Sequence, residues 1–292
     1  MQKITPHLWF DKEAKEATAF YTSLFPNSQV NNVTTMTDTP SGDCDMVTFT
    51  LSGQEFMAIS AGPYFKLNSS ISLFTTFDTE EEIDAVWNKL VDSGKVLMPY
   101  NSYPWATKYG WLEDKYGVSW QLSLNEHHVT GQKITPLLMF TQDLSGKTKE
   151  AVEFYTNLLD GKQEMLVPFE EGEGGDIGHI KHARFSLFNQ NFMAMDGGAS
   201  HAFRFNEAFS LIIHCDTQDE IDRYWQALSA VKESEQCGWC KDKYGVSWQI
   251  VPSIMSTMMT TGTKEQIARV TQAFLPMKKF DIKKLEEVFN QN

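Results

Sequence analysis

The octapeptide DKYGVSWQ occupies residues 114–121, and the same eight letters return at residues 242–249. The two copies lie 242 − 114 = 128 residues apart. An identical run of this length is not expected by chance, so the sequence predicts an internal duplication. Solenoid repeats recur roughly every 20 to 50 residues, and a period as long as this one indicates a duplicated domain instead.

Four further segments match between the two halves of the chain, in the same order. KITPHLWF (3–10) pairs with KITPLLMF (133–140), EATAFYTSL (16–24) with EAVEFYTNL (150–158), FTLSGQEFMAIS (49–60) with FSLFNQNFMAMD (185–196), and ISLFTTFDTEEEIDAVWNKL (71–90) with FSLIIHCDTQDEIDRYWQAL (209–228). The spacing between copies drifts, as expected when loops gain or lose residues. We therefore expect domains at 1–127 and 132–254, followed by a tail at 255–292 without a counterpart.

Composition narrows the class of protein. At 292 residues the chain is long enough for about two domains, and 41% hydrophobic residues suffice for two cores. The formal net charge of −13 repels phosphate backbones and anionic lipids, which argues against nucleic acid and membrane partners. The start MQKITPHLWF lacks the apolar core of a signal peptide, and no run approaches the roughly 18 apolar residues that span a bilayer. A cytoplasmic protein is expected, and four cysteines are too few for a disulfide framework.

Each half of the sequence reads as two βαβββ units. The first unit has a strand at 4–10, a helix that Pro26 stops, and three short strand patterns near 29–37, 44–51 and 55–61. The second unit has a strand at 71–77, a helix opened by the capping box of Thr79 and Glu82, and strands near 95–100, 108–113 and 118–124. The other half repeats this plan, with Thr217 and Glu220 as its capping box. The sequence thus predicts an α+β chain of four βαβββ units.

The tail contains two helical patterns. Thr263 and Gln266 form a capping box, and an apolar stripe follows it at Ile267, Val270 and Phe274. Pro276 ends this helix, and a second short one carries an apolar stripe at Ile282, Leu285 and Phe289. Helices this short are not stable alone, so we expect both stripes to pack on a domain surface.

The paired βαβββ units, the opening ITPxLxF, the helix motif EAxxFY and the closing DKYGVSWQ together resemble the PhnB-like family of the vicinal oxygen chelate (glyoxalase/bleomycin-resistance) superfamily. The resemblance covers about residues 3–252, and the tail is similar as well. It implies a tandem duplication of glyoxalase-like domains, in which each pair of units curls into a half-open barrel around a ligand cup. Family members with one domain commonly pair into dimers. The chain resembles such a dimer fused into one polypeptide, and we expect a 33.3 kDa monomer.

The resemblance also places the metal-ligand positions of the superfamily. Gln121 and Gln249 fall where metal-binding members carry their last carboxylate ligand. The other positions map to Thr5 and Thr135, to Ser72 and Ser210, and to the neighbourhood of Thr48 and Arg184. Divalent metals of this chemistry prefer imidazole or carboxylate donors, so we expect neither a metal nor another cofactor.

Candidate ligand-binding residues lie on strand faces that the resemblance turns toward the cups and in the segment before the octapeptide. They are Thr5, His7, Trp9, Ser72, Trp111, Gln121, His182, Ser210, His214, Cys237, Trp239 and Gln249. One cup is expected to hold Thr5, His7, Trp9, Ser72 and Gln121, and the other their second-half partners. We favour the second cup, because it would combine His182, His214, Cys237 and Gln249. Ordinary packing in the core or at a domain interface is the alternative for each histidine and for Trp111 and Trp239.

The run CGWC at 237–240 is similar to a thioredoxin-type redox site, but that chemistry needs the first cysteine at a helix N-terminus. Here the run leads into a strand, so two free thiols are expected.

Three functions are open at this point. The first is binding of a small molecule, or metal-free catalysis on it. The second is sequestration of a toxic compound, as in bleomycin-resistance proteins. The third is the activity in the family's inherited label, 3-demethylubiquinone-9 3-methyltransferase. A methyltransferase of the usual kind needs a Gly-rich loop after a strand for S-adenosylmethionine, and the sequence has none.

Overall fold

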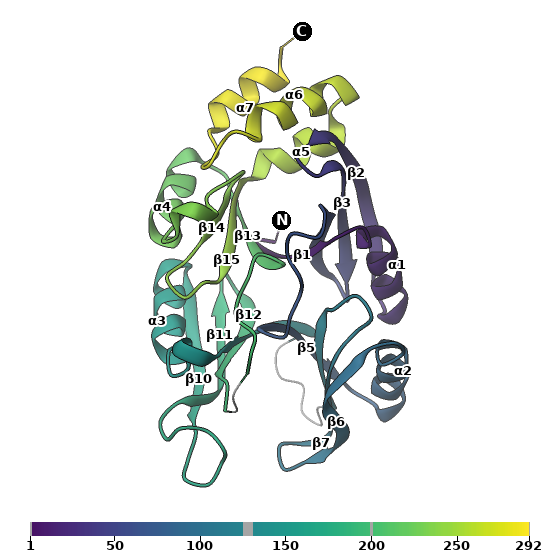
Figure 1. Ribbon diagram of the computed structural model, residues 1–292, viewed down its shortest axis with the longest axis vertical. Helices are drawn as coiled ribbons and strands as arrows, with labels where there is room; N and C mark the ends of the chain where they lie inside the picture. Colours follow the sequence, from purple (N-terminus) through teal and green to yellow (C-terminus); the bar gives the residue numbers. More distant parts are fainter. Residues whose placement is uncertain (1, 125–130, 199–200, 292) are drawn as a thin grey trace. The chain divides into compact units, whose positions relative to one another are not determined.

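The computed structural model describes residues 2–124, 131–198 and 201–291. The chain divides into two compact units, each built on one β-sheet (Figure 1). Unit 1 comprises residues 1–23, 28–66 and 206–292, and unit 2 comprises residues 24–27 and 67–205. The described residues include no helix long and apolar enough to cross a bilayer.

Unit 1 contains a seven-stranded sheet in the order β14-β15-β13-β1-β4-β3-β2. Its strands are β1 (Ile4–Phe10), β2 (Gln29–Thr39), β3 (Gly42–Leu51), β4 (Gln54–Ser60), β13 (Phe209–Cys215), β14 (Trp239–Lys241) and β15 (Ser247–Pro252). Its helices are α1 (Ala14–Leu24), α4 (Gln218–Leu228), α5 (Ser253–Thr261), α6 (Lys264–Phe274) and α7 (Ile282–Phe289).

Unit 2 contains an eight-stranded sheet in the order β10-β11-β12-β9-β5-β8-β7-β6. Its strands are β5 (Ile71–Phe77), β6 (Lys95–Tyr103), β7 (Ala106–Glu113), β8 (Ser119–Leu124), β9 (Ile134–Phe140), β10 (Gly161–Pro168), β11 (Ile180–Leu187) and β12 (Gln190–Asp196). Its helices are α2 (Glu80–Leu90) and α3 (Thr148–Leu158).

Each sheet joins one repeat unit from each half of the sequence. In unit 1, β1 pairs antiparallel with β13, so that His7 lies opposite Ser210. In unit 2, β9 pairs antiparallel with β5, so that Leu137 lies opposite Ser72. The compact units therefore cut across the sequence repeats. Of the expected junction between the repeats at 127–131, only Gly131 is among the described residues. The expected monomer stays a prediction.

The fourth repeat unit departs from the predicted βαβββ plan. Between Leu228 and Trp239 the chain advances 239 − 228 = 11 residues, against 111 − 90 = 21 between the corresponding Leu90 and Trp111. The shorter segment leaves no room for a strand like β6 and its hairpin. A short 3₁₀ helix (Lys232–Ser234) leads into the three-residue strand β14 instead.

The octapeptide proves to be a self-contained turn and strand. In the first copy, one carboxylate oxygen of Asp114 accepts backbone N–H groups from Tyr116 and Val118, and the other accepts the indole N–H of Trp120 at 2.9 Å. Asp242 makes the same three contacts in the second copy, with Tyr244, Val246 and Trp248. Both indoles are fully buried. In both copies the aspartate therefore fixes the turn and the tryptophan. The glutamine that ends the run then lies on the opposite face of the strand.

Two-residue alternation separates the two faces of each sheet. One face packs on helices: α4 packs on β13 to β15, α2 on β5, β7 and β8, and α3 on β10 to β12. Val118, Trp120 and Leu122 are buried on that face, as expected from the sequence. The other face, called the inner face here, carries Ser119 and Gln121 in β8.

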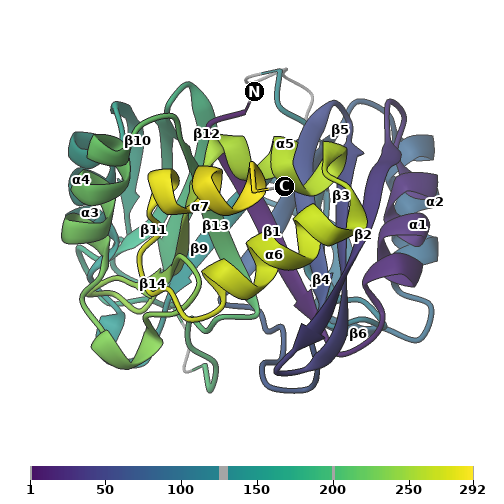
Figure 2. The same cartoon turned by 90° about the horizontal axis from the view of Figure 1, so that it is seen from above.

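The tail closes the open side of the unit 1 sheet. Helix α5, which the sequence reading missed, packs on both β15 and β2, which lie near opposite ends of the strand order. Helices α6 and α7 lie side by side above it (Figures 1 and 2). The backbone N–H groups of Cys237 and Gly238 donate to Met277 and Lys278, at 2.7 Å each. Gly238 has φ +80°, and a Cβ there would lie 2.3 Å from the Phe280 ring, so this junction requires glycine.

Candidate functional site

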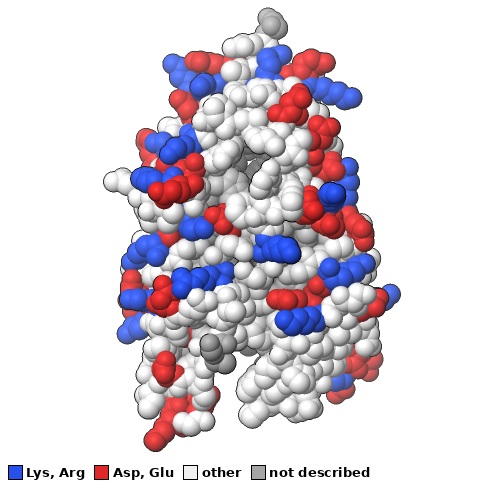
Figure 3. Space-filling view, viewed as in Figure 1, with Lys and Arg blue, Asp and Glu red and all other residues white. Residues whose placement is uncertain are grey.

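A cavity of about 740 Å³ lies against the inner face of the unit 1 sheet. Strands of the sheet form its floor, and residues of the tail form part of its wall. In Figure 3 the surface is hollowed at this place, and the visible wall of the hollow is mostly free of charged side chains. Three acidic residues do line the cavity: Glu55 and Glu233 are exposed, and Glu207 pairs with Lys241 at 2.7 Å. Its interior is therefore uncharged.

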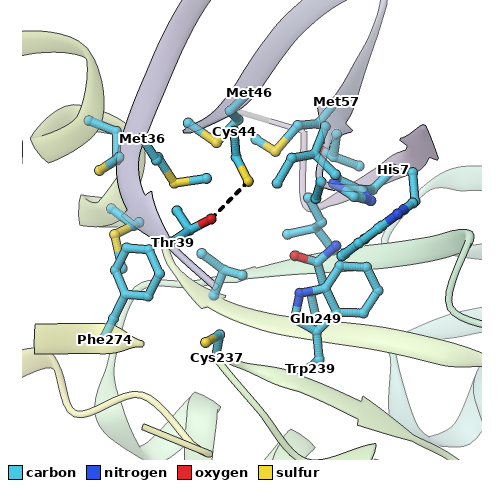
Figure 4. Close-up of a pocket in the computed structure, with 18 of the residues that line it drawn as sticks. His7, Met36, Thr39, Cys44, Met46, Met57, Cys237, Trp239, Gln249 and Phe274 are labelled. Atoms are coloured by element: carbon cyan, nitrogen blue, oxygen red, sulfur yellow. Dashed lines mark hydrogen bonds between the residues drawn. The ribbon is translucent and has the colours of Figure 1, made fainter. Parts of the chain in front are cut away.

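Two tryptophans form an aromatic wall. The Trp9 and Trp239 rings meet edge to face, with centroids 6.0 Å apart, and the His7 ring meets Trp239 at 5.3 Å (Figure 4). The Trp9 indole N–H donates to the Gly62 carbonyl at 2.8 Å, which fixes the ring. Such an arrangement offers rigid aromatic surface to a ligand.

A glutamine forms a polar part of the floor, and a buried serine holds it in place. Gln249 donates through Nε2 to Ser210 Oγ at 2.9 Å, and Ser210 Oγ lies 3.3 Å from His7 Nδ1. Ser210 is completely buried and does not line the cavity. Gln249 Oε1 has no hydrogen-bond partner within the described part of the chain, so it is free to accept a hydrogen bond from a ligand.

Both histidines of this cavity are held neutral. Burial lowers the pKa of His7 to about 3. Burial also lowers the pKa of His214 to about 4, with the nearby positive charge of Lys3 adding to the effect. His214 Nε2 lies 3.0 Å from Thr5 Oγ1, and its buried Nδ1 has no partner among the described residues. Neither ring is a cationic imidazolium at neutral pH, so neither is a good general acid, and a base with a pKa near 3 is weak.

Methionines complete the wall. Strands β2, β3 and β4 contribute Met36, Met46 and Met57, and α5 contributes Met255 and Met259 (Figure 4). Thioether side chains adapt to irregular apolar ligands. The sequence reading missed these residues and the tail's Phe274. The run SIMSTMM at 253–259 was the available indication, since it is more apolar than an exposed connection needs to be.

The two cysteines of the CGWC run do not form a redox site. Both are free thiols, Cys237 half-buried and Cys240 buried. Burial raises the pKa of Cys237 to about 11 and raises the pKa of Cys240 well above its usual range. Cys237 faces the cavity, and its thiol donates to the Leu275 carbonyl at 3.3 Å (Figure 4).

The remaining candidates lie in unit 2. Gln121 donates through Nε2 to Ser72 Oγ at 2.8 Å, as Gln249 does to Ser210. Here, however, Gln121 Oε1 accepts the phenol O–H of Tyr109, also at 2.8 Å. The Trp111 indole donates to Ser119 Oγ, and its ring meets that of His201 at 6.1 Å. The pKa of His182, on β11, falls to about 4 because of burial and the charge of Arg184.

The topology corrects the expected grouping of these residues. Thr5, His7 and Trp9 do not share a cup with Ser72 and Gln121, because β1 pairs with β13 and not with β5. They share unit 1 with Ser210, His214, Cys237, Trp239 and Gln249. His182 belongs to unit 2, whereas His214, Cys237 and Gln249 belong to unit 1. The second cup was favoured because it would combine these four residues, so that reason no longer holds.

The donors at the superfamily's metal positions do not suit a divalent metal. In unit 1 they are hydroxyls of Thr5, Thr48 and Ser210 and the neutral amide of Gln249, with no carboxylate among them. The His7 ring lies beside them but is bonded to Ser210. Among the described residues, no group of three or more His, Cys, Asp or Glu side chains is placed to hold a metal ion.

Comparison with known proteins agrees with the repeat and the fold. The model of the family described as 3-demethylubiquinone-9 3-methyltransferase matches residues 2–123 and again residues 132–251. The chain belongs to this family. It is the PhnB-like family that the sequence resembles, here in tandem form. No curated protein matches the chain.

Solved structures fall into two groups. A PhnB protein from Bacillus cereus is 46% identical over 42% of this chain and 100% of its own, with a TM-score of 0.40. Glyoxalase I from Zea mays is 10% identical over 87% of this chain and 95% of its own, with a TM-score of 0.53. A mutant of that enzyme covers 88% of this chain and 97% of its own, with a TM-score of 0.55. The likeness to glyoxalase I shows that this chain has the tandem glyoxalase-like fold.

Proposed function

We propose that unit 1 binds an uncharged, largely apolar small molecule that carries an aromatic hydroxyl group. The observation behind this proposal is the unused acceptor Gln249 Oε1 on the floor of an uncharged, aromatic and thioether-lined cavity. A ligand hydroxyl would donate to this oxygen. Trp9 and Trp239 would pack against its ring.

Unit 2 supports the choice of a phenol. In that unit the matching acceptor, Gln121 Oε1, is taken by the protein's own Tyr109. The residue at the Tyr109 position of the other repeat is Cys237, whose side chain is much smaller and makes a different hydrogen bond. Tyr109 thus indicates what kind of group fits a Gln–Ser pair on this fold.

Binding without turnover is favoured over catalysis. Ser210 and His7 are within hydrogen-bond distance, but the serine is completely buried and the histidine has a pKa of about 3. A nucleophile must reach its substrate, and its base must accept a proton near neutral pH. This pair does neither, and the same serine–glutamine contact occurs in unit 2 without a histidine. Sequestration of a small molecule therefore fits the cavity better than nucleophilic catalysis by this serine does.

Fluorescence titration with 2-naphthol and 2-methoxynaphthalene tests the proposal, because the second probe keeps the rings and the oxygen but has a methyl group in place of the hydroxyl hydrogen. We expect 2-naphthol to bind about tenfold more tightly, the effect of one hydrogen bond. Gln249→Leu should abolish this difference, and the matched variant Gln121→Leu should preserve it. Equal affinities for the two probes, or equal effects of the two variants, would contradict the proposal. Mass spectrometry after incubation with S-adenosylmethionine should recover unmodified 2-naphthol, and a methylated product would restore the methyltransferase hypothesis.

A further inference from the structure

Unit 2 contains a guanidinium group, that of Arg184, with no acidic partner among the described residues. Arg184 lies in β11, where the alternate residues Ala183, Phe185 and Leu187 are buried on the side that packs on α3. Because side chains alternate along a strand, Arg184 points to the inner face of the sheet. Its neighbours there across the sheet are Met165 on β10 and Met193 on β12.

The contacts of this group are poor for a charged side chain. Nη2 approaches Met165 Sδ at 3.9 Å, and the buried Nε has no hydrogen-bond partner. Within the described part of the chain, no aspartate or glutamate forms an ion pair with Arg184. Guanidinium keeps its charge at every accessible pH, and a half-buried charge without a partner is unfavourable. An anion bound at this place would balance the charge.

The nearby His182 neither balances the charge of Arg184 nor adds to it. His182 lies two residues before Arg184, on the same face of β11, and it is close enough for the arginine to lower its pKa. It is neutral at pH 7, so it adds no second positive charge. It can still form a hydrogen bond with whatever binds beside Arg184.

We propose that Arg184 binds the carboxylate of a small organic acid whose remaining part is apolar. The planar fork of a guanidinium matches the two oxygens of a carboxylate, and one guanidinium balances one negative charge. The row of residues across the sheet, Met165, Met193 and Leu137, suits an apolar body. In unit 1 the corresponding position is Thr48, which faces Met57 in the same register. This site is therefore particular to unit 2 and stands or falls independently of the proposed function of unit 1.

Isothermal titration with sodium octanoate, octan-1-ol and inorganic phosphate tests the site. We expect octanoate to bind the wild-type chain and both other probes to bind at least tenfold more weakly. Arg184→Thr, which installs the residue of the other repeat, should lower octanoate affinity by about 10- to 100-fold, the effect of a hydrogen bond to a charged group. Arg184→Lys should lie between the two, because it keeps the charge and loses the fork. Unchanged octanoate affinity in Arg184→Thr, equal binding of octan-1-ol, binding of phosphate alone, or no binding of octanoate at millimolar concentration would each overturn the proposal.

Two further measurements separate a ligand site from a structural role. Without ligand, Arg184→Thr should raise the melting temperature, because it removes a charge that has no partner; a lower melting temperature would show that Arg184 holds the fold together. In NMR titrations, saturating octanoate should raise the pKa of His182 toward its ordinary value, because the bound carboxylate offsets the charge of Arg184. A His182 pKa that does not move on octanoate binding would place the acid elsewhere.

Discussion

The inner faces of the two sheets share one polar contact and differ at several positions around it. Both have a glutamine that donates to a buried serine, Gln249 to Ser210 in unit 1 and Gln121 to Ser72 in unit 2. Around this pair, unit 1 has His7, Cys237, Met46 and Thr48 where unit 2 has Leu137, Tyr109, His182 and Arg184. The contact between the glutamine and the serine is the same in both units, whereas these four neighbouring positions differ. Among the described residues, Gln249 of unit 1 has an acceptor oxygen without a partner, and Arg184 of unit 2 has no acidic partner.

The octapeptide, which both units share, gives the largest expected effect. Asp114→Ala and Asp242→Ala each remove a buried carboxylate and so deprive two backbone N–H groups and a buried indole N–H of their acceptor. We expect each variant to lower the free energy of unfolding by about 3 to 5 kcal/mol, measured by urea denaturation.

The asparagine variants are the matched controls. An amide oxygen keeps the two backbone contacts and loses only the indole contact, so Asp114→Asn and Asp242→Asn should each cost less than the alanine variant. Losses that differ strongly between the two aspartates would mean that the octapeptide does not have the same role in both units.

The sequence predicted most elements of this fold because their patterns are local. The helix Glu80–Leu90 is an example: a capping threonine, Thr79, precedes an apolar face at Ile83, Val86 and Leu90, all buried. The turn of the octapeptide is equally local, because Asp114 bonds to residues no more than six positions later in the chain. These features depend on residues within about one helical turn or strand of each other, and the sequence contains that information directly.

Strand partners and the cavity wall could not be predicted in the same way. Nothing near His7 in the sequence indicates that β1 pairs with β13, more than 200 residues later, and not with β5. That choice decides which residues share a cavity, so the expected set mixed residues of both units. The fourth repeat lost a strand through a shorter loop, and α5 was missed because its apolar stripe faces a cavity and not an ordinary core.

Both units contain a histidine whose pKa burial lowers, and the shift is larger for His7 in unit 1 than for His182 in unit 2. The pKa of His7 is about 3 in the folded chain and about 6.5 in an unfolded one. As pH falls below 6.5, the unfolded state binds a proton that the folded state does not, so stability falls from pH 6.5 toward pH 3. At pH 5 this residue should cost about 2 kcal/mol relative to pH 7.

Exchange of the counterpart residues tests this assignment. His7→Leu should reduce the loss of unfolding free energy between pH 7 and pH 5 by about 2 kcal/mol. Leu137→His, which places an imidazole beside Ser72 as His7 lies beside Ser210, should increase that loss by a similar amount. Urea denaturation at the two pH values measures both. An unchanged pH dependence in His7→Leu would show that carboxylates, and not this histidine, control acid stability.

Cysteine labelling is expected to show the smallest effect, and it tests the place of ligand binding at a single residue. All four cysteines belong to unit 1, and Cys237, which faces the cavity, is the one that is not fully buried. With a pKa of about 11, only about one thiol in a thousand is ionised at pH 8, so labelling by iodoacetamide should be about 100-fold slower than that of free cysteine.

Saturating 2-naphthol should slow the labelling of Cys237 further by covering the thiol. Octanoate should leave the rate unchanged, because its proposed site lies in unit 2. Mass spectrometry follows the reaction, with Cys237→Ser as the unreactive control. Protection of Cys237 by octanoate, or no protection by 2-naphthol, would contradict the assignment of 2-naphthol to unit 1 and of octanoate to unit 2.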